Sequence, residues 1–230
     1  MSFAWSRPPK VIGHRGNPAE AAENTLASFL SAMDAGARAV ELDVRMTRDG
    51  ALVVHHDAEL GRVVPGQGEI ERMLRAELPA EVPLFADVLR ALPRDALVDA
   101  EIKPDAGNAE EVPAAMLAVV DACGARERVL ATSFAPELAA DYAGRAAVPG
   151  GWILPFPPGR EDLEEWPSLA FVMLAVEAAI PEAIEPILEG GRVPCVWTVN
   201  DAAEGEALLA AGAASLVTDR PRKLVAKLGP

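Results

Sequence analysis

Eight short apolar runs alternate with segments of helical pattern along the chain, and this alternation constrains the fold more than any other feature. The runs are nearly continuous in apolar residues, which is typical of strands that are buried on both faces. Regular alternation of such strands with helices predicts parallel βαβ units. The runs cover residues 11–14, 39–44, 96–102, 129–134, 151–156, 169–176, 193–199 and 215–219.

Eight βαβ units favour an α/β fold of the closed (β/α)8 TIM-barrel type over an open sheet. No G-x-G-x-x-G turn follows the first run, as it would in a dinucleotide-binding open sheet. A length of 230 residues suits one barrel, so we expect a single domain over residues 1–230. A doubly wound sheet is the alternative.

The second unit departs from the regular pattern. The turn-like TRDG and the apolar LVVHHD follow the run at 39–44, which predicts a hairpin extension of the second strand. A loosely patterned stretch over residues 57–82 then forms a short excursion before the next helix. Further back, Asn24 and Gly36 bracket an amphipathic stretch, and we expect them to be the N-cap and the end of the first helix.

Composition narrows the choice of partners. The net charge of −14, from 21 basic and 35 acidic residues, argues against nucleic acid and anionic membrane surfaces as partners. The start MSFAWSRPPK lacks the pattern of a secretory signal, and no apolar window is long enough to span a bilayer. Two distant cysteines in apolar surroundings indicate buried thiols. We therefore expect a cytoplasmic protein.

Polar residues gather where the predicted strands end, although the strand starts are almost purely apolar. In a TIM barrel the active site lies at these carboxyl ends and in the loops that follow them. The candidates are His14, Arg15, Glu41, Asp43, His56, Glu101, Lys103, Ser133, Trp197 and Asn200.

Glu41 and Asp43 lie two positions apart in one strand, so their side chains should face the same way. A buried carboxylate without a partner is costly, so such a pair either binds a metal or pairs with basic side chains. An internal ion-pair network is one alternative, in which Glu41, Asp43 and Glu101 pair with Arg15, Arg45 and Lys103.

Charge counting favours a cation. The carboxylates Glu41, Asp43 and Glu101 together with Arg15 and Lys103 carry a net −1, which would repel an anion, whereas one divalent ion makes the group +1. Three oxygen ligands with open positions suit Mg²⁺ or Ca²⁺. Such a pocket would hold a phosphate.

Two adjacent histidines follow the hairpin. Alternation sends His55 and His56 to opposite faces, so at most one of them should face the carboxylates. That histidine and His14, on opposite sides of the pocket, would together provide an acid and a base that titrate near neutrality.

Seven motifs resemble the glycerophosphodiester phosphodiesterase family in order and spacing, and they span residues 11 to about 220. They are GHRG, AENT, VELDV, LVVHHD, VPLFADVL, EIK and WTVN. The resemblance implies a TIM-barrel hydrolase that uses a divalent metal to cleave glycerophosphodiesters into an alcohol and glycerol 3-phosphate. It makes His14 and His56 the acid and base, Glu41, Asp43 and Glu101 the metal ligands, Arg15 and Lys103 the phosphate contacts, and Trp197 the wall beside the glycerol.

The chain departs from the family pattern at a few positions. Ala22 stands where proline is usual, and Arg62-Val63-Val64 replaces the common Arg-Thr-Thr, which makes the polar contacts of the excursion hard to predict. Two other functions compete with the phosphodiesterase. One is a metal-dependent sugar-phosphate isomerase or aldolase, for which Lys103 is the only lysine at a strand end, and the other is a non-catalytic binding barrel.

Overall fold

A closed barrel of parallel strands forms the centre of the computed structural model, which describes residues 3–230. β1 pairs with both β2 and β9, and this closes the sheet upon itself. The TIM-barrel prediction is confirmed, and the doubly wound alternative is wrong. The parallel strands are β1 (Val11–Gly13), β2 (Ala39–Met46), β4 (Leu97–Ile102), β5 (Val129–Ser133), β6 (Gly150–Leu154), β7 (Leu169–Ala175), β8 (Val193–Trp197) and β9 (Ser215–Thr218).

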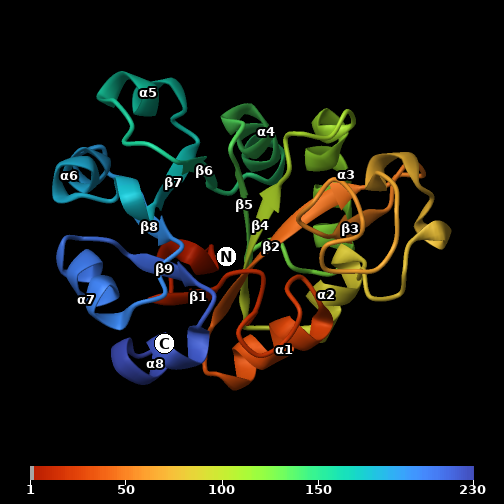
Figure 1. The fold of residues 1–230 in the computed structure, drawn as a ribbon. Coiled ribbons are helices and arrows are strands. Elements are labelled where there is room, and N and C mark those ends of the chain that lie inside the picture. The colour runs from red at the N-terminus through yellow and green to blue at the C-terminus, as the bar shows by residue number, and fades with distance from the viewer. Residues whose placement is uncertain (1–2) are drawn as a thin grey trace.

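Helices surround the strands on the outside of the barrel (Figure 1). Each one follows a strand and turns its apolar side inward, as a parallel sheet requires of its crossover connections. None of the helices within residues 3–230 is long and apolar enough to cross a membrane. The helices are α1 (Leu26–Asp34), α2 (Phe85–Ala91), α3 (Val112–Ala122), α4 (Pro136–Ala146), α5 (Arg160–Glu165), α6 (Pro181–Glu189), α7 (Ala202–Ala210) and α8 (Pro221–Leu228).

The start of α1 differs from the expected cap. Thr25 is the N-cap, and its side chain accepts a hydrogen bond from the backbone N–H of Ser28. The expectation for Asn24 is wrong, because that residue has a φ of 57° and its side-chain amide donates to Asp43 instead. Gly36 follows the helix with a φ of 89°, a conformation that suits glycine at a helix end.

Trp5 closes the amino-terminal end of the barrel. It lies in the short helical turn η1 (Ala4–Ser6) and is fully buried. Its indole N–H donates to the carbonyl of Arg128, just before β5, over 3.0 Å. Its ring packs edge-on against Phe171 of β7 at a centroid distance of 5.9 Å. Trp5 and Phe171 thus fill the barrel interior at the amino-terminal ends of the strands, and the polar residues lie at the opposite, carboxyl-terminal ends.

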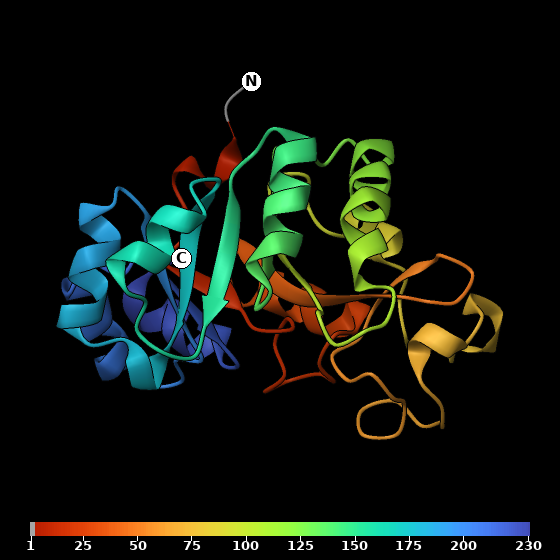
Figure 2. The same cartoon turned by 90° about the horizontal axis from the view of Figure 1, so that it is seen from above.

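The predicted hairpin is present beside β2. β3 (Leu52–Val54) pairs antiparallel with the second half of β2. The excursion follows it and contains the helical turns η2 (Ile70–Arg72) and η3 (Arg75–Glu77). In Figure 2 it extends sideways from the end of the barrel opposite the N-terminus. A separate apolar cluster anchors it, formed by Val53, Leu60, Val64, Ile70, Leu78 and Val82.

Candidate active site

A pocket of about 90 Å³ lies at the carboxyl ends of the strands. This volume accommodates several water-sized groups and so a small polar ligand. Seven of the eight predicted site residues line it, and Asp43 lies fully buried beside them. The lining residues are His14, Arg15, Glu41, His56, Asp99, Glu101, Lys103, Phe134, Ile153, Met173, Trp197 and Val217.

Neighbouring strands bring the carboxylates together. In the parallel register of β2 and β4, Glu41 lies opposite Asp99 and Asp43 lies opposite Glu101. Glu41, Asp43 and Glu101 each place one carboxylate oxygen within 4.8 Å of the others. The alternation predicted for β2 therefore holds, and the adjacent strand adds a second pair of acids.

Two basic side chains enter this cluster. Lys103 Nζ lies 2.7 Å from Glu101 Oε1 and 3.2 Å from Asp43 Oδ1. Arg15 Nε lies 3.3 Å from Asp43 Oδ2. The ion-pair network considered from the sequence therefore exists around Asp43 and Glu101. Its third base does not take part, because Arg45 pairs with Asp105 over 3.0 Å.

Glu41 is left outside that network. Within residues 3–230 no lysine or arginine side chain forms an ion pair with it. It accepts the backbone N–H of Arg15 over 2.8 Å, and His14 Nε2 lies 3.9 Å away. With every group ionised, the three carboxylates Glu41, Asp43 and Glu101 would outnumber the two basic side chains, as in the charge count made from the sequence.

Burial and mutual repulsion raise the pKa values of two of the acids toward the neutral pH range. Burial, with the charge of Asp43, raises the pKa of Glu41 to about 7 and that of Glu101 to about 8. Burial also opposes ionisation of Asp43, but Lys103 and Arg15 outweigh it and lower the pKa of that carboxyl. A divalent cation would relieve this repulsion. The donors are all oxygens, so the cluster fits a hard cation such as Mg²⁺ or Ca²⁺.

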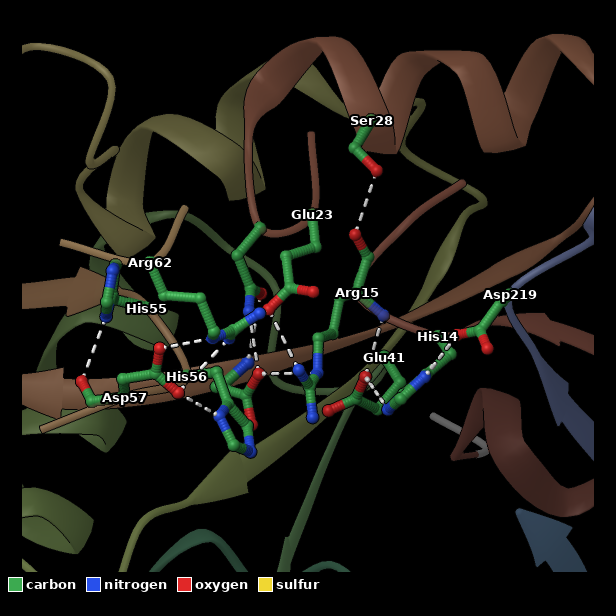
Figure 3. Close-up of polar contacts among 12 residues, drawn as sticks. His14, Arg15, Glu23, Ser28, Glu41, His55, His56, Asp57, Arg62 and Asp219 are labelled. Atoms are coloured by element: carbon green, nitrogen blue, oxygen red, sulfur yellow. Dashed lines mark hydrogen bonds and ion pairs between the residues drawn. The ribbon is translucent and has the colours of Figure 1, made fainter. Parts of the chain in front are cut away.

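Each histidine of the pocket is tied to an aspartate through Nδ1 (Figure 3). His14 Nδ1 lies 2.7 Å from Asp219 Oδ1, and His56 Nδ1 lies 2.7 Å from Asp57 Oδ1. An ionised carboxylate only accepts hydrogen bonds, so the proton is on Nδ1 and Nε2 is left for a ligand.

The surroundings of the two histidines shift their pKa values in opposite directions. Burial lowers the pKa of His56, and the charge of Asp43 and the hydrogen bond to Asp57 offset this effect only in part. Burial also opposes protonation of His14, but the hydrogen bond to Asp219 and the charge of Glu41 prevail and raise its pKa. Two groups of one type with pKa values moved apart are suited to complementary acid and base roles.

The neighbouring histidine lies outside the pocket. His55 is buried, and its Nδ1 lies 2.9 Å from the backbone carbonyl of Asp57. Figure 3 shows its ring on the far side of Asp57 from His56. Only one histidine of the pair therefore faces the carboxylates, as strand alternation requires.

Apolar side chains form the opposite wall of the pocket. Trp197 packs edge-on against Phe134 with centroids 5.7 Å apart and planes at 89°. Its indole N–H donates to the carbonyl of Met173 over 2.9 Å, which holds the ring in place. Ile153 and Val217 complete this wall. The pocket thus has a charged side and an apolar side.

A comparison with known protein families shows to which family this chain belongs. The model of the glycerophosphoryl diester phosphodiesterase family matches residues 14–223. The chain belongs to this family. It is 27% identical to a glycerophosphodiester phosphodiesterase of Caldanaerobacter subterraneus over 94% of this chain and 96% of the relative.

Solved structures of similar fold agree with this assignment. One is a phosphodiesterase of Oleispira antarctica in complex with the product sn-glycerol-3-phosphate. It has a TM-score of 0.89 and 26% identity and covers 99% of both chains. Another is a glycerophosphodiester phosphodiesterase of Thermotoga maritima, with a TM-score of 0.79 and 26% identity over 94% of this chain and 96% of that one. The family membership makes this chain a phosphodiester hydrolase acting on glycerophosphodiesters.

Several residues in or beside this pocket were not predicted. Asp99 lies two positions before Glu101 in β4, so the alternation argument used for β2 would have found it. Asp57 directly follows His56 and ends the LVVHHD motif. Asp219 and Phe134 directly follow β9 and β5. Asp219 ends the apolar run at 215–219, so the strand-end argument would have found it, whereas no local pattern marks the apolar Phe134.

The two remaining strand-end candidates lie beside the pocket and do not line it. The Ser133 hydroxyl is buried and donates to the carbonyl of Ile102 over 2.8 Å. Asn200 donates to Asp219 over 2.8 Å, so it holds the aspartate that contacts His14. Both residues support neighbours that are closer to the ligand space.

Proposed function

We propose that this phosphodiesterase hydrolyses glycerophosphodiesters to an alcohol and sn-glycerol 3-phosphate with two histidines and one divalent metal ion. The observation that carries the proposal is that His14 and His56, each tied to an aspartate, line one pocket with the carboxylate cluster and two basic side chains. We propose further that residues 1–230 act as a single phosphodiesterase domain.

The carboxylates Glu41, Asp43 and Glu101 are the proposed metal ligands. Their oxygens lie close together. Burial and the charge of Asp43 raise the pKa values of Glu41 and Glu101, and a cation would offset both effects. A bound Mg²⁺ or Ca²⁺ would supply positive charge beside the phosphoryl oxygens.

Arg15 and Lys103 are the proposed phosphate contacts. Both line the pocket, and nearby carboxylates raise the pKa of each against the effect of burial, so both stay charged. Fixed positive groups stabilise charge that develops on phosphoryl oxygens in the transition state. Trp197 would pack against the carbon skeleton of the glycerol on the apolar side.

The histidines transfer protons in this proposal. His56 accepts the proton of the attacking hydroxyl through Nε2, and His14 donates a proton to the departing alkoxide. The attacking group is water, or the glycerol 2-hydroxyl of the substrate, which would give a cyclic phosphate that water then opens. The two Nδ1–aspartate contacts support the assignment because they orient both rings.

The isomerase or aldolase alternative fits this pocket less well. Such chemistry needs a lysine or a carboxylate placed to remove a proton from carbon. The candidate Lys103 is held by Asp43 and Glu101, and these charges raise its pKa, which makes it a poor base. A non-catalytic barrel has no use for two histidines with separate aspartate partners.

A product assay tests the proposal. Purified enzyme is incubated with a panel of glycerophosphodiesters and Mg²⁺, Mn²⁺ or Ca²⁺, and released alcohol and glycerol 3-phosphate are measured, with EDTA as the control. We expect EDTA-sensitive hydrolysis that falls by about 10²- to 10⁴-fold in His14→Ala and in His56→Ala, with folding intact. Wild-type turnover in either variant would refute the two-histidine mechanism, and ligand binding without product would favour a binding barrel.

A further inference from the structure

Arg62 reaches the active site from the excursion. It lies in a tight turn in which the backbone N–H of Gly61 donates to the carbonyl of Val64 over 2.9 Å. The residues Leu60 and Val64 on either side of it are buried in the apolar cluster that anchors the excursion. Arg62 therefore has a firmly held backbone, while 49% of its side chain is exposed.

The guanidinium of Arg62 contacts two carboxylates at once (Figure 3). Its Nε and Nη2 donate to Asp57 Oδ2 and Oδ1 over 2.5 and 3.1 Å. The same Nη2 donates to Glu23 Oε1 over 2.6 Å. The contact with Asp57 is the bidentate arrangement that a planar guanidinium forms best.

Each of these carboxylates also holds one group of the proposed catalytic machinery. Asp57 Oδ1 contacts His56 Nδ1 over 2.7 Å, and Glu23 Oε1 accepts from Arg15 Nη1 over 2.8 Å. Among residues 3–230, Arg62 is the one basic side chain whose ion pairs reach both carboxylates. A continuous chain of contacts thus runs from His56 through Asp57, Arg62 and Glu23 to Arg15.

We propose that Arg62 is a positioning residue that holds His56 in its working orientation through Asp57 and that shares Glu23 with Arg15, so that Arg15 keeps its positive field for the phosphate. The proposal rests on the proposed function of these two residues. It also assigns a role to the excursion, which would carry an essential part of the active-site support.

The physical argument for His56 concerns the Asp57 carboxylate. Asp57 is partly exposed, so without Arg62 water would compete for its oxygens and the side chain would be free to turn away. His56 would then lose the partner that fixes its Nδ1 proton and its ring orientation. The expected result is a lower kcat.

The argument for Arg15 concerns the Glu23 carboxylate. Arg62 and Arg15 share the same oxygen of Glu23, so two cations neutralise one acid. Without Arg62, Glu23 would pair with Arg15 alone. The charge of Glu23 would then cancel more of the positive field that Arg15 directs at the phosphate. The expected result is a higher KM for the diester.

Steady-state kinetics with three variants test the proposal. We expect Arg62→Met to lower kcat/KM by about 10- to 100-fold, as is typical for residues that orient catalytic or ligating groups. Arg62→Lys should recover only part of the loss, because one ammonium cannot form the two-pronged contact. The matched control is Arg72→Met, since Arg72 also lies in the excursion and forms an ion pair with Glu69 over 2.6 Å.

The controls separate a local effect from a general one. Wild-type kinetics in Arg62→Met would overturn the proposal, and so would an equal loss in Arg72→Met, because it would point to the stability of the excursion alone. The loss caused by Arg62→Met should also shrink in an Asp57→Asn, Glu23→Gln background, since coupled residues are not additive. Full additivity would count against the chain of contacts.

An NMR measurement tests the positioning without any turnover. The chain has 3 histidines, so ¹⁵N-labelled imidazoles give a spectrum that single His→Gln variants can assign. We expect Arg62→Met to change the Nδ1 and Nε2 signals of His56 and to leave those of His14 in place. An unchanged His56 would overturn the proposal. If wild-type enzyme releases no product but the His56 signals change, the proposed function fails while the positioning role stands.

Discussion

His14 and Asp219 lie 205 positions apart in the chain and join Nδ1 to Oδ1 over 2.7 Å. The parallel pairing of β1 with β9, in which Gly13 lies opposite Thr218, brings them together where the barrel closes. Asn200 donates to the other carboxylate oxygen of Asp219 over 2.8 Å. One end of the proposed proton-transfer machinery therefore depends on barrel closure.

Asp219→Asn should lower kcat without unfolding the protein. An amide lacks the charge that favours a protonated His14 and can present an N–H where an acceptor is needed. We expect a loss of about 10- to 100-fold, smaller than that of His14→Ala. Steady-state assays check this, with Asp201→Asn as the control because Asp201 caps α7 and pairs with the exposed Lys223, away from the pocket. Normal kcat in Asp219→Asn would show that His14 needs no aspartate.

His55→Ala and His56→Ala should have opposite effects on activity and stability. His55 is buried away from the pocket, so its removal should lower the unfolding midpoint and leave kcat nearly normal. His56 lines the pocket and is partly exposed, so its removal should lower kcat strongly and alter stability little. Paired thermal unfolding and kinetic measurements check this contrast. The reverse pattern would assign the proton transfer to His55.

Metal binding should stabilise the protein more at pH 8 than at pH 5. In the metal-free protein the pKa values of Glu41 and Glu101 are raised from 4.5 to about 7 and about 8. A carboxyl with a raised pKa in the folded state binds its proton more tightly there, so the free energy of unfolding falls as pH rises from about 4.5 to about 8. Each group contributes at most about 1.4 kcal/mol per pH unit.

Thermal unfolding with EDTA or with added Mg²⁺ or Ca²⁺ at the two pH values measures this effect. Protons compete with the metal at pH 5, so the metal-induced rise in Tm should be small there and larger at pH 8. Glu101→Gln should reduce both the pH dependence and the metal effect. An equal rise in Tm at both pH values would argue against these ligands.

Trp5→Ala and Trp197→Ala should separate stability from function. Trp5 is fully buried at the strand starts, so its truncation should lower the free energy of unfolding by about 3–5 kcal/mol. Its kcat, measured where the variant is still folded, should stay near normal. Trp197 lines the pocket, so its truncation should mainly raise KM. Urea titrations and steady-state assays provide both quantities, and a large KM change in Trp5→Ala would contradict this division.

Local patterns along the chain predicted the architecture and most of the site. Each of the eight apolar runs coincides with a parallel strand to within two residues at either end, and the hairpin at β3 lies where the turn signal placed it. A parallel barrel places the carboxyl ends of all its strands at one end. Polar residues at those strand ends therefore lie close together around one pocket. This is why His14, Glu41, His56, Glu101 and Lys103 were found without a structure.

The tertiary structure alone decided which side chains support that pocket. Asn24 had been expected to cap a helix, but the close approach of its loop to β2 directs its amide to Asp43. Asp219 and Arg62 reach the histidines from β9 and from the excursion. Strand periodicity and helix caps depend on a few neighbouring residues, so they can be read along the chain. Contacts made by barrel closure and by a folded-back loop depend on register and packing between distant segments, which no local pattern contains.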